Sequence, residues 1–164
     1  MNILIWLSEG TWEACVDAAA DLSQPDTRFT LLHVIDPRIG HAVRAAHSGL
    51  MGRARPGADP AAAIDQAAAA AQAALLTAAQ QRLRRPATHH GRHGHTEREV
   101  IIACESTDLL IMARDAGHTR PGPHSIGPAA RFVLDHAPCR VLLVWPDEPT
   151  GRTPLPHPPP PPPH

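Results

Sequence analysis

A segment rich in glycine, proline and polar side chains, set between two short apolar runs, is the part of this chain best suited to bind a ligand. It extends from Arg114 to Ser125, and Gly127 follows it at the start of a predicted helix. Glycine lets a backbone approach an anion closely, and the N–H groups of a helix N-terminus point toward it. These residue types favour the binding of phosphate groups by the backbone, with serine and arginine as added donors.

Two strands and one helix are predicted to position this segment. Asp108–Ala113 and Val141–Trp145 are apolar runs too short for helices, so they predict buried strands. The helix between them has Pro128 near its start and ends at Pro138. Its inward positions recur at helical spacing: Ile126, Ala130, Val133, Leu134 and Ala137. Such a unit is a right-handed crossover between parallel strands, and its loop leaves the carboxyl end of a strand, where open α/β sheets bind ligands.

The rest of the chain alternates in the same way. Buried strands are predicted at 2–7 and 29–35, and a polar edge strand at 86–93. A first helix between the first two strands has a predicted inner face of Cys15, Ala18, Ala19 and Leu22. The order strand, helix, strand, loop, helix, strand, helix, strand, helix, strand predicts the α/β class, with a five-stranded parallel sheet and helices on both faces.

Two further helices have recognisable starts. An alanine-rich helix opens at Asp59-Pro60, with proline in its first turn. Its predicted inward stripe is Ile64, Ala68, Ala71, Leu75 and Ala79, widened by Leu76 and Leu83. The next helix begins with the pattern Thr96-Glu97-Arg98-Glu99, which predicts a capping box with Thr96 as the cap.

Composition divides the chain into one domain, residues 1–146, and a disordered proline-rich tail, residues 147–164. Ten of the 19 prolines lie from residue 146 onward, six of them consecutive at 158–163. Such a segment cannot join a sheet or form a helix, and a solvated tail is the simplest interpretation. The long polar connection 36–60 is of the kind that is functional or mobile.

Several classes of function are excluded by composition. The chain has no lysine, which rules out a Walker A loop and Schiff-base chemistry. Its net charge of −1 without a basic run predicts no nucleic-acid partner, and no apolar run approaches the length of a membrane helix. The three cysteines are scattered on apolar faces and no signal peptide is evident, which predicts buried thiols in a cytoplasmic protein.

The C-terminal half resembles a universal stress protein domain. The residues that carry the resemblance are Asp108-Leu109-Leu110, Gly127, His136-Ala137-Pro138-Cys139 and the apolar run Val141–Val144. The resemblance covers about residues 1–146 and implies strand order 3-2-1-4-5, as in adenine nucleotide alpha hydrolase-like folds. It also implies a cytoplasmic stress-response protein that forms a homodimer through its last strand, where an apolar edge needs cover.

Some members of that family bind ATP, and the resemblance assigns candidate nucleotide-site residues here. The position of an aspartate at the end of the first strand is occupied by Ser8, and the adenine position by Val34. The two glycines of the family loop correspond to Ala113 and Ala116 in one register, or to Arg114 and Gly117 in another. Gly127 is followed by Pro128 instead of serine or threonine, and proline offers neither a hydroxyl nor an N–H.

These departures favour a non-enzymatic regulatory or interaction protein with no certain cofactor. The alternative is a stress sensor that binds ATP or AMP in the cleft beside the first and fourth strands, with slow ATP hydrolysis still open. A second alternative is a metal-binding protein, because His89, His93 and His95 recur at even spacing on one face of the edge strand. No cysteine or carboxylate joins them at ligand spacing, so a solvated polar edge is the preferred interpretation.

Overall fold

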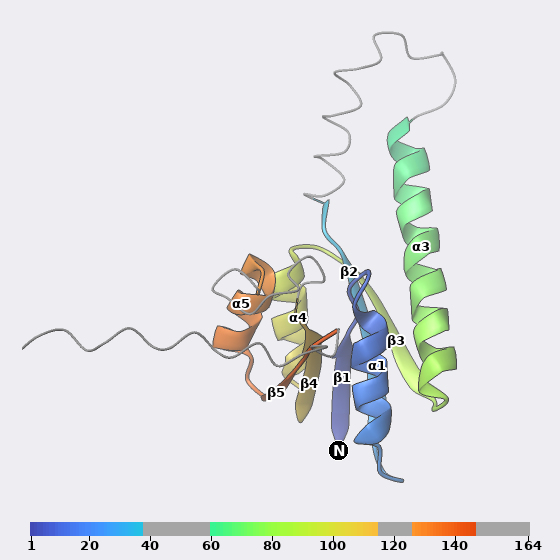
Figure 1. Cartoon of the computed structure of the whole chain (residues 1–164). Coiled ribbons are helices and arrows are strands. Elements are labelled where there is room, and N and C mark those ends of the chain that lie inside the picture. The colour runs from blue at the N-terminus through green and yellow to red at the C-terminus, as the bar shows by residue number, and fades with distance from the viewer. Residues whose placement is uncertain (38–59, 115–125, 147–164) are drawn as a thin grey trace, which may run out of the picture.

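Five parallel strands form one sheet in the order β3-β2-β1-β4-β5 (Figure 1). The structure is a computed structural model that describes residues 1–37, 60–114 and 126–146. The elements are β1 Asn2–Trp6, α1 Trp12–Asp21, β2 Arg28–Ile35, α3 Pro60–Leu83, β3 Ala87–His93, α4 Thr96–Cys104, β4 Leu109–Ala113, α5 Pro128–His136 and β5 Arg140–Val144. The predicted fold class and strand order are therefore confirmed.

The two faces of the sheet carry two separate hydrophobic cores. Successive side chains of a strand point to opposite faces, so Ile3 and Ile5 of β1 pack toward α1 and α3. Leu4 and Trp6 pack on the other face, toward α4 and α5. Figure 1 shows α1 and α3 on one side of the sheet and α4 and α5 on the other. This arrangement leaves the carboxyl ends of β1 and β4 open between the two helical layers, as the crossover predicts.

The polar segment predicted as an edge strand is β3, and it lies at one edge of the sheet. It pairs with β2 over its whole length, from Phe29↔Ala87 to Ile35↔His93. Its few apolar residues suffice because an edge strand needs burial on one side only. The opposite edge is β5, which pairs with β4 from Leu109↔Arg140 to Ala113↔Val144.

Two predicted helix faces are partly wrong. Leu22 is the C-cap of α1 and is 41% exposed, and the buried residues of that helix are Cys15, Val16 and Ala19. In α3, Ala71 is exposed, whereas Gln72 beside it is buried. The buried line of α3 consists of Gln72, Leu76, Ala79 and Leu83. Alanine on every face gives this helix no amphipathic pattern, so its orientation is set by its contacts with the sheet.

The predicted capping box at the start of α4 is also wrong. The N-cap is His95, and its side chain makes no capping hydrogen bond. The buried side chain of Asp36, at the end of β2, takes this role instead: its Oδ2 accepts hydrogen bonds from the N–H and the hydroxyl of Thr96, each at 3.4 Å. A carboxylate at a helix N-terminus also stabilises the helix dipole.

The cysteines are free thiols: Cys15 and Cys104 are buried and Cys139 is half-buried. Burial, reinforced by the adjacent Cys139, raises the pKa of Cys104 to about 12. None of the helices in the described ranges is long and apolar enough to cross a membrane. Most of the long connection 36–60, the candidate residue Gly117 and the proline-rich tail 147–164 lie outside the described residues.

Candidate functional site

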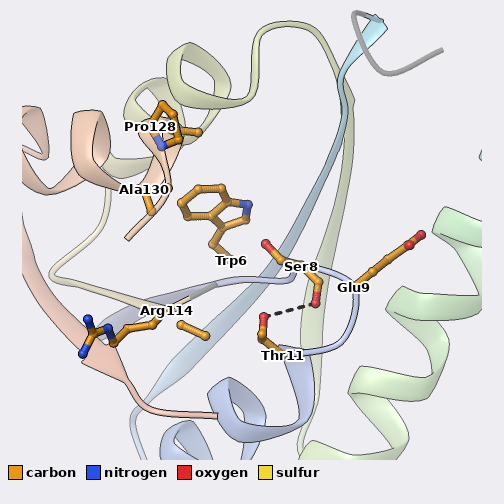
Figure 2. Close-up of a pocket in the computed structure, with 10 residues that line it drawn as sticks. Trp6, Ser8, Glu9, Thr11, Arg114, Pro128 and Ala130 are labelled. Atoms are coloured by element: carbon orange, nitrogen blue, oxygen red, sulfur yellow. Dashed lines mark hydrogen bonds between the residues drawn. The ribbon is translucent and has the colours of Figure 1, made fainter. Parts of the chain in front are cut away.

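A cleft opens at the carboxyl ends of β1 and β4, where the crossover loop is predicted to bind a ligand (Figure 2). One wall comes from the end of β1 and the turn after it, a second from the end of β4, and a third from the N-terminus of α5. The lining residues are Trp6, Ser8, Glu9, Thr11, Ala113, Arg114, Gly127, Pro128, Ala129 and Ala130. Its volume is about 190 Å³, below the roughly 300–1,000 Å³ typical of sites that enclose a whole small-molecule ligand.

Most of the site residues predicted from the sequence meet in this cleft. Ser8, Ala113, Arg114, Gly127 and Pro128 all line it. Val34 does not line it: it is buried in the core between the sheet and helices α4 and α5.

The turn after β1 is held by its own backbone. The carbonyl oxygen of Ser8 accepts hydrogen bonds from the N–H groups of Thr11 and Trp12, at 3.2 and 3.1 Å. The hydroxyl of Thr11 donates to the same oxygen at 3.4 Å, as the dashed line in Figure 2 shows. This turn leaves the side chain of Ser8 exposed at the cleft and places Glu9 beside it. The carboxylate of Glu9 points away from Ser8 (Figure 2).

Arg114 directs its charge away from the cleft. Its guanidinium lies over the ring of Trp145, 3.7 Å from the ring centroid, and Figure 2 shows it on the far side from Ser8. The backbone N–H of Arg114 donates to the carbonyl oxygen of Val144 at 3.0 Å. Burial lowers the pKa of Arg114 from its ordinary value. The guanidinium that the sequence suggested as a phosphate ligand therefore lies against the ring of Trp145 and not in the cleft.

The N-terminus of α5 offers fewer donors than an ordinary helix. Gly127 is its N-cap, with an extended backbone and no capping side chain, and Pro128 occupies the first turn. An α-helix begins with four N–H groups that lack helical partners, and these are the donors of an anion site. Proline removes one of them, so Gly127, Ala129 and Ala130, which all line the cleft, carry the remaining three N–H groups.

Sequence reasoning missed Trp6, Glu9, Thr11, Ala129 and Ala130 as lining residues. Trp6 is 8% exposed and stands between Ser8 on one side and Pro128 and Ala130 on the other. Its position as the last residue of β1 is the signal that could have identified it, because side chains at strand carboxyl ends border the ligand crevice.

His33 belongs to a separate buried polar cluster on the other face of the sheet. Gln72 Nε2 lies 3.2 Å from His33 Nδ1 and donates to the carbonyl oxygen of His33 at 3.0 Å. Burial lowers the pKa of His33, against an opposing effect of the carboxylate of Glu9. The contact with Gln72 agrees with the prediction that a neighbouring side chain satisfies this histidine.

The histidines of β3 are not gathered into a metal site. His89 hydrogen-bonds through Nε2 to Gln80 Oε1 on α3. Within residues 1–37, 60–114 and 126–146, no three histidine, cysteine, aspartate or glutamate side chains lie together as metal ligands would. The metal alternative therefore finds no support in the part of the chain that the structure describes.

A five-stranded parallel sheet of order 3-2-1-4-5 with helices on both faces and a cleft between β1 and β4 defines an open, doubly wound α/β domain whose cleft lies at the topological switch point. The model of the universal stress protein family matches residues 1–144, and the chain belongs to this family. No curated protein matches the sequence significantly.

Solved structures agree with this assignment. Hypothetical protein MJ0577 superposes with a TM-score of 0.64 at 18% identity, over 88% of this chain and 94% of that one. A universal stress protein in complex with cAMP superposes with a TM-score of 0.59 at 12% identity, over 90% of this chain and 98% of that one. A universal stress protein family protein from Arabidopsis thaliana with AMP bound superposes with a TM-score of 0.57 at 13% identity, over 88% of this chain and 91% of that one. At these identities the likeness establishes the fold and not the ligand.

Proposed function

We propose that this chain is a cytoplasmic, non-enzymatic regulatory protein of the stress response whose cleft does not hold ATP in the manner of its nucleotide-binding relatives. The observation that carries the proposal is the chemistry of the cleft wall. Pro128 removes a donor from the start of α5, and the charge of Arg114 is directed onto Trp145. Free thiols suit a reducing compartment such as the cytoplasm.

The lining residues also support a role without catalysis. Among the described residues that form the cleft, Ser8 is the hydroxyl best placed as a nucleophile, and no histidine lines the wall to activate it. A serine needs an adjacent general base for nucleophilic chemistry. Glu9 points away from Ser8 in Figure 2.

The second candidate function is a stress sensor that binds AMP or ATP in the same cleft. Its support is that the structural relatives above carry AMP or cAMP, and that the predicted residues of the site meet in one place. The two candidates separate on one measurement. Protein purified without added nucleotide is denatured, the released material is separated by anion exchange, and AMP and ATP are then titrated calorimetrically into the native protein. Near-stoichiometric nucleotide would contradict the first proposal.

Replacing Pro128 with serine should raise the affinity for ATP. The change restores one N–H and adds a hydroxyl where phosphates would sit, and a hydrogen bond to a charged group is worth about 1.5–3 kcal/mol. We expect ATP to bind at least about tenfold more tightly, which corresponds to about 1.4 kcal/mol. Calorimetry checks this, with Pro25→Ser, in an exposed turn, as the matched control. An unchanged affinity in a protein that does bind ATP would place the phosphates elsewhere.

We also propose a homodimer that forms through β5. This edge strand pairs with β4 on one side, and its apolar residues Val141–Val144 are only half-buried. An exposed apolar edge strand presents unpaired backbone N–H and C=O groups, which a second copy of the strand can bind. Light scattering should give twice the chain mass of 17.6 kDa. Val141→Lys should shift the protein to monomer, whereas Leu22→Lys, at an exposed position after α1, should not; a wild-type monomer would contradict the proposal.

A further inference from the structure

A second pocket lies at the opposite end of the sheet from the cleft, where β1 and β2 begin and α4 ends. Its volume is about 230 Å³. The lining residues are Asn2, Ile3, Leu4, Arg28, Phe29, Thr30, Thr88, His90, Ala103, Ser106 and Thr107. Most of them carry a hydroxyl, amide, imidazole or guanidinium group, although the pocket lies between a helix and a sheet, where an apolar lining is the usual finding.

The polar floor of this pocket is a patch on one face of two neighbouring strands. Thr30 of β2 stands opposite Thr88 of β3, and Leu32 stands opposite His90. Leu32 belongs to the core under α4 and α5, so His90 and Thr88, two residues apart on β3, face the same way. Arg28 lies two residues before Thr30 and shares that face. Four polar side chains therefore converge beside the end of α4.

Two of these side chains have unused bonding capacity. His90 Nδ1 is buried, and no hydrogen-bond partner for it exists among the described residues. The side chain of Arg28 forms no ion pair with any residue in the described ranges, and its backbone N–H donates to the carbonyl oxygen of Met1 at 2.9 Å. An unmade hydrogen bond at a buried group destabilises the fold. A ligand that bonds to His90 would recover this energy.

We propose that this pocket binds a small oxyanion, a carboxylate or a phosphate. The guanidinium of Arg28 supplies the positive charge, the hydroxyls of Thr30 and Thr88 supply donors, and the orphaned imidazole of His90 supplies a further polar contact. No carboxylate side chain is among the described residues that line the pocket. The site is independent of the cleft between β1 and β4, and the proposal holds with or without nucleotide there.

The negative groups near the pocket already have partners. Asp108 lies outside the lining, and its Oδ2 accepts a hydrogen bond from the N–H of Asn2 at 2.7 Å. At the end of α4, the N–H of Thr107 donates to the carbonyl oxygen of Cys104 at 3.1 Å, and its hydroxyl donates to that of Ala103 at 3.0 Å. The helix C-terminus opposes an anion only weakly, and charge-assisted hydrogen bonds contribute more than this effect takes away.

The test is an NMR titration of amide signals in the full chain with sodium phosphate and, separately, sodium acetate, at constant ionic strength with chloride. We expect saturable shifts of Thr30, Thr88 and Ser106 with at least one of the two anions, and the stronger response identifies the phosphate or the carboxylate as the ligand class. Arg28→Gln should weaken binding at least about tenfold, the loss of one charge-assisted bond. Because Arg28 is exposed, this variant should fold normally.

His90→Leu should also abolish the shifts, and His89→Leu is its matched control. His89 is adjacent in sequence but points to the other face of β3, where it bonds to Gln80 on α3. The His89→Leu control should bind the anion with the same titration midpoint as the wild-type protein. Absence of saturable shifts with both anions, or an unchanged midpoint in Arg28→Gln, would overturn the proposal and leave a pocket filled by water.

Discussion

Replacing Gly91 with alanine should lower the free energy of unfolding by about 2–4 kcal/mol, a sum of the costs of overpacking and of broken buried hydrogen bonds. A Cβ atom at this position of β3 would stand 2.5 Å from Oε1 and 2.8 Å from Cδ of Gln72. Gln72 is only 8% exposed and cannot swing into solvent without giving up its bonds to His33 and to the carbonyl oxygen of Arg92. Urea denaturation measures the loss.

A double-mutant cycle identifies the cause. Gln72→Ala alone removes the amide and leaves buried groups of His33 without a partner, at a cost of about 1–3 kcal/mol. In that background Gly91→Ala meets no side chain, so its cost should fall below about 1 kcal/mol. An equal cost of Gly91→Ala in both backgrounds would show that backbone conformation, and not the contact with Gln72, requires glycine here.

The same contact shows why α3 could not be oriented from the sequence. Alanine surrounds Gln72 on the helix, so the pattern contains no apolar stripe from which a buried polar residue would stand out. Gln72 is buried because Gly91 leaves space for it, and the two residues belong to different elements. Four of the five strands, by contrast, follow from apolar runs that are local in the chain, β3 being the polar exception, and the sheet order follows from the family resemblance.

Long-range contacts also explain the errors at the ends of elements. Thr96 reads as an N-cap because serine and threonine usually take that place, but the carboxylate of Asp36, which follows β2, bonds to it. The position of Arg114 at the cleft was predictable from the crossover. Its direction was not, because the ring of Trp145, beyond the last strand, determines where the guanidinium lies.

Replacing Trp6 with alanine should cost about 3–5 kcal/mol of stability, the usual range for a large aromatic side chain removed from a core. Trp6 packs in the core under α4 and α5 with Leu32, Val34 and Met112, and it is 8% exposed. Trp6→Phe keeps most of the ring and should cost less. Trp12→Ala is a control, since Trp12 is only half-buried and packs on the opposite face. Chemical denaturation compares the three variants.

The Trp6→Ala substitution should destabilise the wall of the cleft as well as the core, because Trp6 lies between Ser8 and the start of α5 (Figure 2). Without the ring, the helix N-terminus at Pro128 and Ala130 loses the surface against which it packs, so α5 should loosen before the sheet does. Hydrogen exchange checks this: the amides of Val133 and Leu134, inside α5, should lose more protection in Trp6→Ala than those of Leu4 and Ile5 of β1. Equal loss in both elements would mean that Trp6 stabilises the domain as a whole and does not specifically hold the cleft wall in place.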